Sequence, residues 1–238
     1  MSDSNVASAF EAFLQGWLMR QRCYLDELLS HQQNMTDFDN IRGLINRVIC
    51  HYGQYYEEKS KVAQNNILLV FSPPWFTSLE RMFLWMAGFK PGMTFEVVNT
   101  ALEDELSQEQ NHRLLQIQQE TKLKERELND ELAKLQESMA APPLFEMARS
   151  HGRLCLEQIH GDPSMDAESN ISDDAVPNTL KVALENLVIR ADALRRNTTL
   201  KVVHVLRPSQ VVTFFAAVAE LQLRVRAWGL EKDSQGGG

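Results

Sequence analysis

The sequence predicts an all-α protein, an extended multi-helix bundle with one long central helix at about residues 107–140 and no sheet. Three observations favour this class. Apolar residues recur at helical spacing along most of the 238 residues. No alternating apolar and polar run and no strand-joining turn dipeptide appears. No glycine or proline stands between Ser107 and Pro142, where an uninterrupted helix would be about 50 Å long.

Two amphipathic helices are predicted before the most aromatic part of the chain. Apolar residues, among them Phe10 and Trp17, mark one face of a helix over residues 6–29. Thr36 is typical of a helix cap, and the apolar residues of 38–55 repeat at the same spacing. We therefore expect two long helices that meet near Thr36.

The segment from Asn65 to Pro91 is the part around which the predicted bundle is organised. Pro73-Pro74 cannot continue a helix, and Thr77 stands three residues before Glu80, the spacing of a capping box. Gly88 is typical of the left-handed residue that ends a helix. This pattern predicts a short helix that begins at Thr77.

Large aromatic side chains make this short helix the most apolar element of the chain, so we expect it to be buried on nearly every side. A further helix is predicted from a cap at Thr94 to Leu102, followed by the acidic run of residues 103–105. The aromatic residues expected mainly in the core are Trp75, Phe83 and Trp85.

The long central helix is predicted to begin at a second capping box, formed by Ser107 and Gln110. Thr121 and Lys124 interrupt its apolar seam, and an ideal coiled coil would not interrupt its heptads there. Packing within the chain is favoured over a self-associating seam, which remains the alternative. The seam consists of Leu114, Ile117, Leu128, Leu132, Leu135 and Met139.

The last third of the chain predicts a linker and two more helices. Residues 144–159 have a weaker helical pattern, and residues 161–177 hold five acidic residues, no basic ones and two prolines. Strong periodicity returns over 180–203, Pro208 is expected to start the last helix, and Gly229 to close it. The expected organisation is a helical domain over 1–160, an acidic linker over 161–177, a helical pair over 178–230 that packs on the same domain, and a disordered tail over 231–238.

Composition and charge exclude several classes of protein. Hydrophobic content of 44% and charged content of 24% are ordinary for a soluble globular chain, and a net charge of −8 argues against bulk nucleic-acid or anionic-membrane binding. The N-terminus lacks the basic and apolar regions of a signal peptide, and no stretch has the roughly 20 apolar residues of a membrane span. Free thiols in a reducing compartment are expected for the three scattered cysteines, Cys23, Cys50 and Cys155.

No residue pattern predicts catalysis, a cofactor or a metal. His51 has no placeable Ser or Cys partner, so a hydrogen-bonded structural histidine is the favoured interpretation. His151 and Cys155, with His160 nearby, are too few for a metal site, and the carboxylates of 103–105 point in different directions. The phosphate-binding, dinucleotide and hydrolase motifs are absent from the sequence. We therefore expect a protein that is not an enzyme.

The C-terminal helices are basic in an acidic chain. Residues 178–228 hold eight Lys or Arg against three acidic residues. These cations would either meet an acidic partner or nucleic acid, or only balance the acidic first half. The residues in question are Arg190, Arg195, Arg196, Lys201 and Arg207.

Several blocks of sequence resemble a known family. WFT at residues 75–77 and LERMFLWMAGFKP at residues 79–91 are similar to the signature of the plant Delay of Germination domain. HYGQYYEEK at residues 51–59, LSQEQ at 106–110 and LQESMA at 135–140 continue the likeness in the family's order. The same domain forms the C-terminal half of TGA-type leucine-zipper transcription factors. The blocks are spread in the family's order, and the resemblance spans nearly the whole chain.

The resemblance implies a non-enzymatic plant regulator of the nucleus or cytoplasm that acts through protein contacts. It implies transcriptional control or abscisic-acid-linked seed and stress regulation, with type 2C protein phosphatases or transcriptional coregulators as partners, and it allows a homodimer. The alternative is a DNA-associated transcription cofactor that uses the basic C-terminal helices. The candidate interaction residues are Trp75, Thr77, Glu80, Arg81, Trp85, Arg195, Arg196 and Trp228.

Two departures from the family's pattern bear on DNA and haem. Only nine residues, none of them Lys or Arg, precede Phe10, so we expect the basic region and zipper of the TGA factors to be absent. Haem-binding members carry histidines six and two residues before a Trp-Gly pair, which here is Trp228-Gly229. Those positions are Gln222 and Arg226, neither an ordinary iron ligand, so no haem binding is expected.

Overall fold

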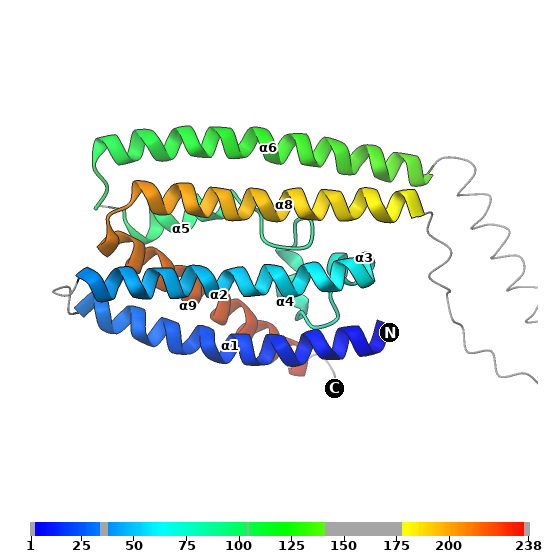
Figure 1. The fold of residues 1–238 in the computed structure, drawn as a ribbon, viewed down its shortest axis with the longest axis horizontal. Helices are drawn as coiled ribbons and strands as arrows, with labels where there is room; N and C mark the ends of the chain where they lie inside the picture. The colour runs from blue at the N-terminus through cyan, green and yellow to red at the C-terminus, as the bar shows by residue number, and fades with distance from the viewer. Residues whose placement is uncertain (1–2, 34–37, 104, 141–177, 236–238) are drawn as a thin grey trace, which may run out of the picture.

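The computed structural model describes residues 3–33, 38–103, 105–140 and 178–235, which form eight α-helices and no β-strand. The predicted all-α class is confirmed. Four long helices lie side by side along the longest axis of the molecule, and a fifth crosses behind them (Figure 1). The expected cap at Thr36, the weak helix over 144–159 and the acidic linker over 161–177 lie outside the described residues.

The long helices form two packed pairs. α1 (Asp3–Gln33) lies antiparallel to α2 (Phe38–Asn65), and α6 (Gln108–Ala140) lies antiparallel to α8 (Asn178–Val205). α9 (Pro208–Gln235) packs extensively on α1 and also on α2, while α8 contacts α2. The first and last helices are therefore direct neighbours in space.

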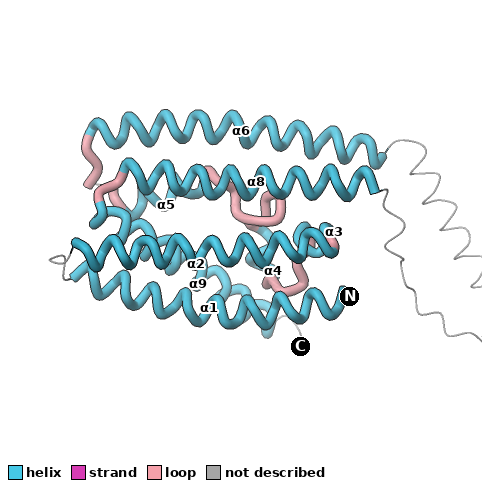
Figure 2. The backbone as a smooth tube through the Cα atoms, in the orientation of Figure 1, coloured by secondary structure: helices cyan, strands magenta, loops and turns pink. Residues whose placement is uncertain are grey.

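Three short helices lie between α2 and α6 in the sequence. α3 (Ile67–Phe71) packs on α2 and α8, and both α4 (Ser78–Met82) and α5 (Met93–Ala101) pack on α9. The longest loop of this region joins α4 to α5 over residues 83–92 and is visible as the pink tube near α8 (Figure 2). This loop is central to the site described below.

The apolar core divides into two main clusters. One gathers around α5 and the first half of α9, with Leu28, Leu44, Val98, Leu102 and Phe214 among its members. The other joins the N-terminal half of α1 to α2, α3 and α8, with Phe10, Trp17, Val70, Trp75 and Leu184 among its members. Because every long helix contributes to at least one cluster, the helices stabilise one another by burial of apolar surface.

Two helix starts follow the local signals. Ser107 and Gln110 form the predicted capping box: Gln110 N donates to Ser107 Oγ at 3.2 Å, and Ser107 N donates to Gln110 Oε1 at 3.0 Å. Pro208 is the first residue of α9, as predicted. Both signals depend only on neighbouring residues, which explains why they are reliable here.

The seam of α6 packs within the chain against α8, which confirms the favoured interpretation of the central helix. At the predicted interruption Lys124 is exposed, but Thr121 and Glu125 are buried in the line of the seam with Leu128. The hydroxyl of Thr121 lies 3.2 Å from that of Thr198 on α8. A polar contact between helices therefore replaces the missing apolar one.

The aromatic segment differs from its prediction. α4 ends at Met82, which is 76% exposed, and Phe83 is 40% exposed, so neither a helix buried on every side nor a core position for Phe83 is correct. Gly88 is not the left-handed residue; Met86 and Ala87 are, with φ of 46° and 62°. The cause is tertiary, because side chains of distant helices bind the carbonyl groups that follow α4.

Two further helix ends differ from the sequence-based expectation. α5 begins at Met93 after Gly92, so Thr94 lies inside the helix and does not cap it. α9 continues through Gly229 to Gln235, which extends it into the expected tail. Gly229 stays helical because it is buried against Thr77, where the absence of a side chain permits close packing.

Candidate functional site

An apolar cavity of about 280 Å³ lies between α2, α5, α8, α9 and the loop of residues 83–92. Aromatic rings supply much of its wall, from α2, from the loop and from α9. Cavities of this kind, mostly apolar with a few polar groups, are the usual binding sites of proteins. The aromatic lining residues include Tyr52, Tyr55, Tyr56, Phe83, Phe89, Phe214 and Phe215.

The charged side chains that line the cavity, among the described residues, are all positive. They are Lys59, Lys90, Arg195 and Arg196. Burial raises the pKa of Tyr56 to about 12 and that of Tyr52 and Tyr55 further, so these phenols remain neutral. The wall is chemically suited to hold an apolar group together with a hydrogen-bond acceptor.

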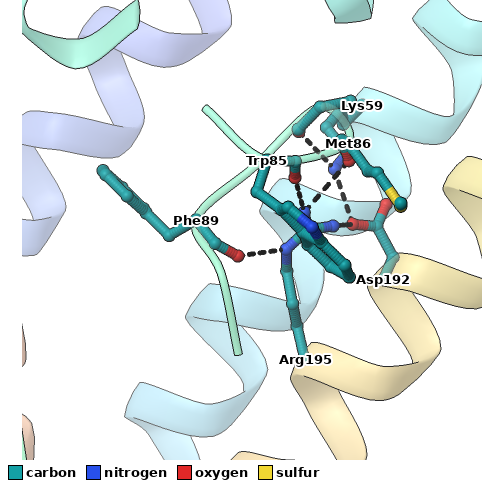
Figure 3. A network of polar contacts seen from close by, with 7 residues as sticks. Lys59, Trp85, Met86, Phe89, Asp192 and Arg195 are labelled. Carbon is teal, nitrogen blue, oxygen red and sulfur yellow. Dashed lines mark hydrogen bonds and ion pairs between the residues drawn. The ribbon is translucent and has the colours of Figure 1, made fainter. Parts of the chain in front are cut away.

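Arg195 of α8 reaches the loop and binds three of its carbonyl oxygens (Figure 3). Its Nε donates to Phe89 O at 2.6 Å, while Nη2 donates to Met86 O at 3.0 Å and to Trp85 O. Its Cζ lies 5.2 Å from the centre of a Trp85 ring, a cation–π arrangement. Nη1 donates to Asp192 Oδ1 at 2.6 Å, so one carboxylate orients the guanidinium.

Lys59 of α2 approaches the same carboxylate from the other side. Its Nζ donates to Asp192 Oδ1 at 2.6 Å and to Ala87 O at 2.9 Å, and its side chain is only 3% exposed. Burial lowers the pKa of Lys59 to about 8, with Arg195 acting in the same direction and Asp192 against it. We call Lys59, Asp192 and Arg195 the loop clamp, in which two cations share one carboxylate.

The clamp holds a tight two-residue turn. Trp85 and Gly88 exchange both backbone hydrogen bonds, at 2.6 and 3.2 Å, around the left-handed Met86 and Ala87. A turn with two left-handed residues normally selects Asn and Gly, because other side chains are strained there. A Cβ on Gly88 would lie 2.8 Å from Arg195 Cζ, so the guanidinium occupies the space of a side chain.

The central helix α6 holds the same loop from outside. Trp85 Nε1 donates to Asn129 Oδ1 at 2.8 Å, and Gly92 N donates to Glu125 Oε1 at 2.7 Å. Lys90 Nζ lies 3.6 Å from the other Glu125 oxygen. Glu125 is buried, so these partners compensate part of the cost of placing a carboxylate there.

The start of α4 is joined to the second half of α9. The predicted capping box is confirmed, since Thr77 N donates to Glu80 Oε2 at 2.8 Å and Glu80 N donates to Thr77 Oγ1 at 3.2 Å. Arg226 Nη1 lies 3.1 Å from Glu80 Oε2 and donates to Trp75 O at 3.2 Å. These contacts are buried. Together with the packing of Gly229 on Thr77, they hold α4 and α9 against each other.

The candidate interaction residues separate by exposure. The exposed ones are Arg81, Arg196 and Trp228, Trp85 is half-buried, and the buried ones are Trp75, Thr77, Glu80 and Arg195. The buried residues all contact other parts of this chain. Only the exposed ones have free surface for a partner.

Sequence analysis missed three residues of the site. Lys59 stands in the block of residues 51–59, where nothing in the sequence separates it from a surface lysine. Glu125 stands among charged residues of the long helix, where the sequence gives no sign that it is buried against the loop. Asp192, one of few acidic residues in the basic C-terminal region, was the available signal of a buried ion pair.

The structure corrects the interpretation of His51. Its ring is 2% exposed and stacks on Trp17 with centroids 4.3 Å apart, but neither ring nitrogen has a hydrogen-bond partner among the described residues. Trp17 Nε1 donates at 2.9 Å to the backbone oxygen of His51 and leaves the imidazole unpaired. His151, Cys155 and His160 lie outside the described residues.

The two positions compared with haem-binding histidines are both engaged inside the fold. Gln222 Oε1 accepts from Gln21 Nε2 at 3.3 Å and from Tyr52 Oη at 3.5 Å. Arg226 pairs with Glu80. Among the described residues no three His, Cys, Asp or Glu side chains gather as a metal site, and no helix is long and apolar enough to cross a membrane.

Several cations of the basic C-terminal region face the acidic helix α6 and its start. Arg190 pairs with Glu131, and Lys201 Nζ lies 2.5 Å from Glu120 Oε2. Arg207 Nη2 donates at 3.3 Å to the backbone oxygen of Glu105. The local positive charge therefore meets negative charge within the chain, as the second of the two interpretations expects.

Three large apolar side chains are exposed at the end of α4 and on α9, the helix that α4 packs against. Met82 is 76% exposed, Phe83 40% and Trp228 57%. Because α4 packs on α9, these residues belong to neighbouring elements, and we call them the α4–α9 surface. Large exposed aromatic and methionine side chains are typical of surfaces that bind other proteins.

Comparisons with known proteins identify the family. A family model described as DOG1, seed dormancy control, matches residues 24–100, which include Lys59 and the whole loop. The chain is 36% identical to protein ZW2 of Arabidopsis thaliana, over 97% of this chain and 100% of that protein. It is 30% identical to protein RESPONSE TO ABA AND SALT 1 of the same plant, over 95% of this chain and 97% of that protein.

The likeness extends to transcription factors. The chain is 26% identical to transcription factor TGA2.3 of Oryza sativa subsp. japonica, over 94% of this chain and 64% of that protein. The chain therefore belongs to the DOG1 family, the Delay of Germination proteins, whose domain the TGA transcription factors share.

Proposed function

We propose that this protein is a non-enzymatic plant regulator that acts by binding other proteins, in transcriptional control or in abscisic-acid-linked seed and stress responses. The names of its relatives support this assignment: one responds to ABA and salt, and others are transcription factors. The transcription-factor relatives suggest the nucleus, and the cytoplasm is the second compartment that we propose.

The observation that carries the proposal is the α4–α9 surface. Met82, Phe83 and Trp228 expose apolar area next to a rigid frame of buried hydrogen bonds between α4 and α9. A partner that covers such side chains gains apolar burial without first having to order them. Type 2C protein phosphatases are the partner class that the family implies.

Sequence-specific DNA binding is the weaker candidate. It requires cations that are free to meet phosphates, and Arg190 and Lys201 of α8 already pair with carboxylates of α6. Arg195 is buried in the loop clamp. Arg196 and Arg207 are exposed, but two cations do not make a phosphate-binding surface.

Binding of the purified protein to a purified plant type 2C phosphatase, measured by calorimetry, tests the proposal. We expect Trp228→Ala or Phe83→Ala to weaken binding at least about tenfold, because truncation of a central interface aromatic typically costs about 2 kcal/mol or more. Leu123→Ala is the matched control, since this side chain is 58% exposed on α6, away from the surface. Binding that is unchanged in both aromatic variants would place the interface elsewhere.

A further inference from the structure

The loop of residues 83–92 belongs to two features at once. Phe83, Leu84, Gly88 and Phe89 line the cavity, so the loop is one of its walls. Phe83 is also part of the α4–α9 surface, and its ring centre lies 6.4 Å from that of Phe89. A displacement of this loop would change the cavity and the surface together.

The loop does not hold its own conformation by local preference. Met86 and Ala87 both have left-handed backbone angles, which L-residues other than glycine rarely adopt. Such residues persist only where surrounding structure fixes them, and they concentrate at segments that switch or close over ligands. Here the surrounding structure consists of side chains from three other helices.

The loop clamp supplies most of that restraint. Lys59 and Arg195 together bind the carbonyl oxygens of four of the five residues from Trp85 to Phe89. The two cations share Asp192 as their only carboxylate among the described residues, and both side chains are buried. The carbonyl oxygens of the strained turn are therefore what compensates the second cation, and the two features depend on each other.

We propose that residues 83–92 form a lid over the cavity, held closed in a strained turn by Lys59, Asp192 and Arg195 and able to open when this clamp is weakened. Opening relaxes Met86 and Ala87, widens the access of solvent to the cavity and displaces Phe83 from the α4–α9 surface. The last consequence rests on the proposed function. The lid itself does not, since it follows from the loop and its contacts alone.

Hydrogen exchange of the full chain, followed by mass spectrometry, tests the lid directly and without any partner. In Arg195→Lys, which keeps the charge but cannot reach several carbonyl groups at once, we expect the amides of residues 84–90 to exchange at least about tenfold faster. Amides of α1 and α9 should keep the protection of the parent protein. Arg190→Lys is the control. Arg190 lies on α8 like Arg195, but it forms an exposed ion pair with Glu131 of α6 and does not contact the loop.

Two more variants give the test a direction. Lys59→Met removes one cation and its bond to Ala87, and it should also accelerate exchange in the loop alone. Ala87→Gly in the Arg195→Lys background relieves strain at a left-handed position and should slow loop exchange again. The lid is refuted if loop exchange stays at the parent rate in both clamp variants, or if α1 exchanges faster by the same factor as the loop. Because partner binding is not measured, failure of the proposed function leaves this result intact.

Discussion

At the scale of single residues, His51 is the buried side chain whose polar atoms are least well paired among the described residues. It is buried, stacks on Trp17 and has no hydrogen-bond partner among the described residues. Burial is the main cause that lowers its pKa from 6.5 to about 4, with the charge of Arg20 acting in the same direction. The folded protein therefore holds this histidine neutral at pH values where the unfolded chain protonates it.

This difference makes stability depend on pH. Between pH 6.5 and 4 the unfolded chain binds a proton at His51 that the folded chain does not, so the free energy of unfolding should fall as the pH falls. The loss from this one group is on the order of 3 kcal/mol. His51→Phe keeps an aromatic ring against Trp17 and cannot titrate, so urea unfolding across this pH range should show a flatter curve for the variant. Parallel curves would show that His51 is not the group responsible.

Trp75 and Phe83 stand in the same signature block but differ in burial. Trp75 is 5% exposed and its ring centre lies 4.5 Å from that of Phe10, whereas Phe83 is 40% exposed. Trp75→Ala should lower the free energy of unfolding by about 3–5 kcal/mol, and Phe83→Ala by roughly 1 kcal/mol or less. Denaturant unfolding of the two variants measures this contrast, and equal losses would contradict the exposure of Phe83.

At the scale of elements, the contact between α4 and α9 depends on a glycine. A Cβ at Gly229 would lie 2.1 Å from Thr77 Oγ1, the atom that caps α4. Gly229→Ala should therefore destabilise the protein although alanine favours a helix interior by about 1 kcal/mol over glycine. Gly53→Ala on α2 is the control, because a Cβ there meets nothing within 4 Å and should stabilise. Thermal unfolding of both variants should move the midpoint in opposite directions.

The sequence distance of the contacts that fix each helix end explains which ends the sequence predicts. The boundaries at Ser107 and Pro208 depend on residues within one helical turn, and both were predicted. The end of α4 depends on Arg195, more than 100 residues away, which binds the carbonyl oxygens that a longer helix would use itself. Sequence periodicity carries no information on such a contact, so the turn at Met86 and the clamp behind it were missed.

At the scale of the whole molecule, charge is arranged so that the acidic and basic helices neutralise each other. Of its ionisable residues 32 are acidic and 24 basic, and α6 and α8 place part of both sets side by side. Long-range repulsion between phosphates and the net charge of −8 should oppose binding to nucleic acid.

A DNA titration at several salt concentrations checks this expectation. We expect binding weaker than about 10⁻⁶ M at physiological salt, in the range of non-specific binding, with a further steep loss as salt increases. Arg196→Ala should change it little, because a single exposed cation contributes about one phosphate contact. Nanomolar binding to one sequence at physiological salt would instead favour the DNA-associated cofactor.

The packing of α9 on α1 has a consequence for how the chain is made. During synthesis α1 leaves the ribosome before α9. The cluster that contains Leu28, Val98 and Leu102 therefore stays incomplete until Phe214 has been added. Contacts between residues so distant in sequence form slowly, because a long segment must first be closed into a loop. A ribosome that stalls or stops before Pro208 would release a chain with this core open, a substrate for chaperones and proteases. This core cluster is thus complete only after α9 (Pro208–Gln235) has been synthesised.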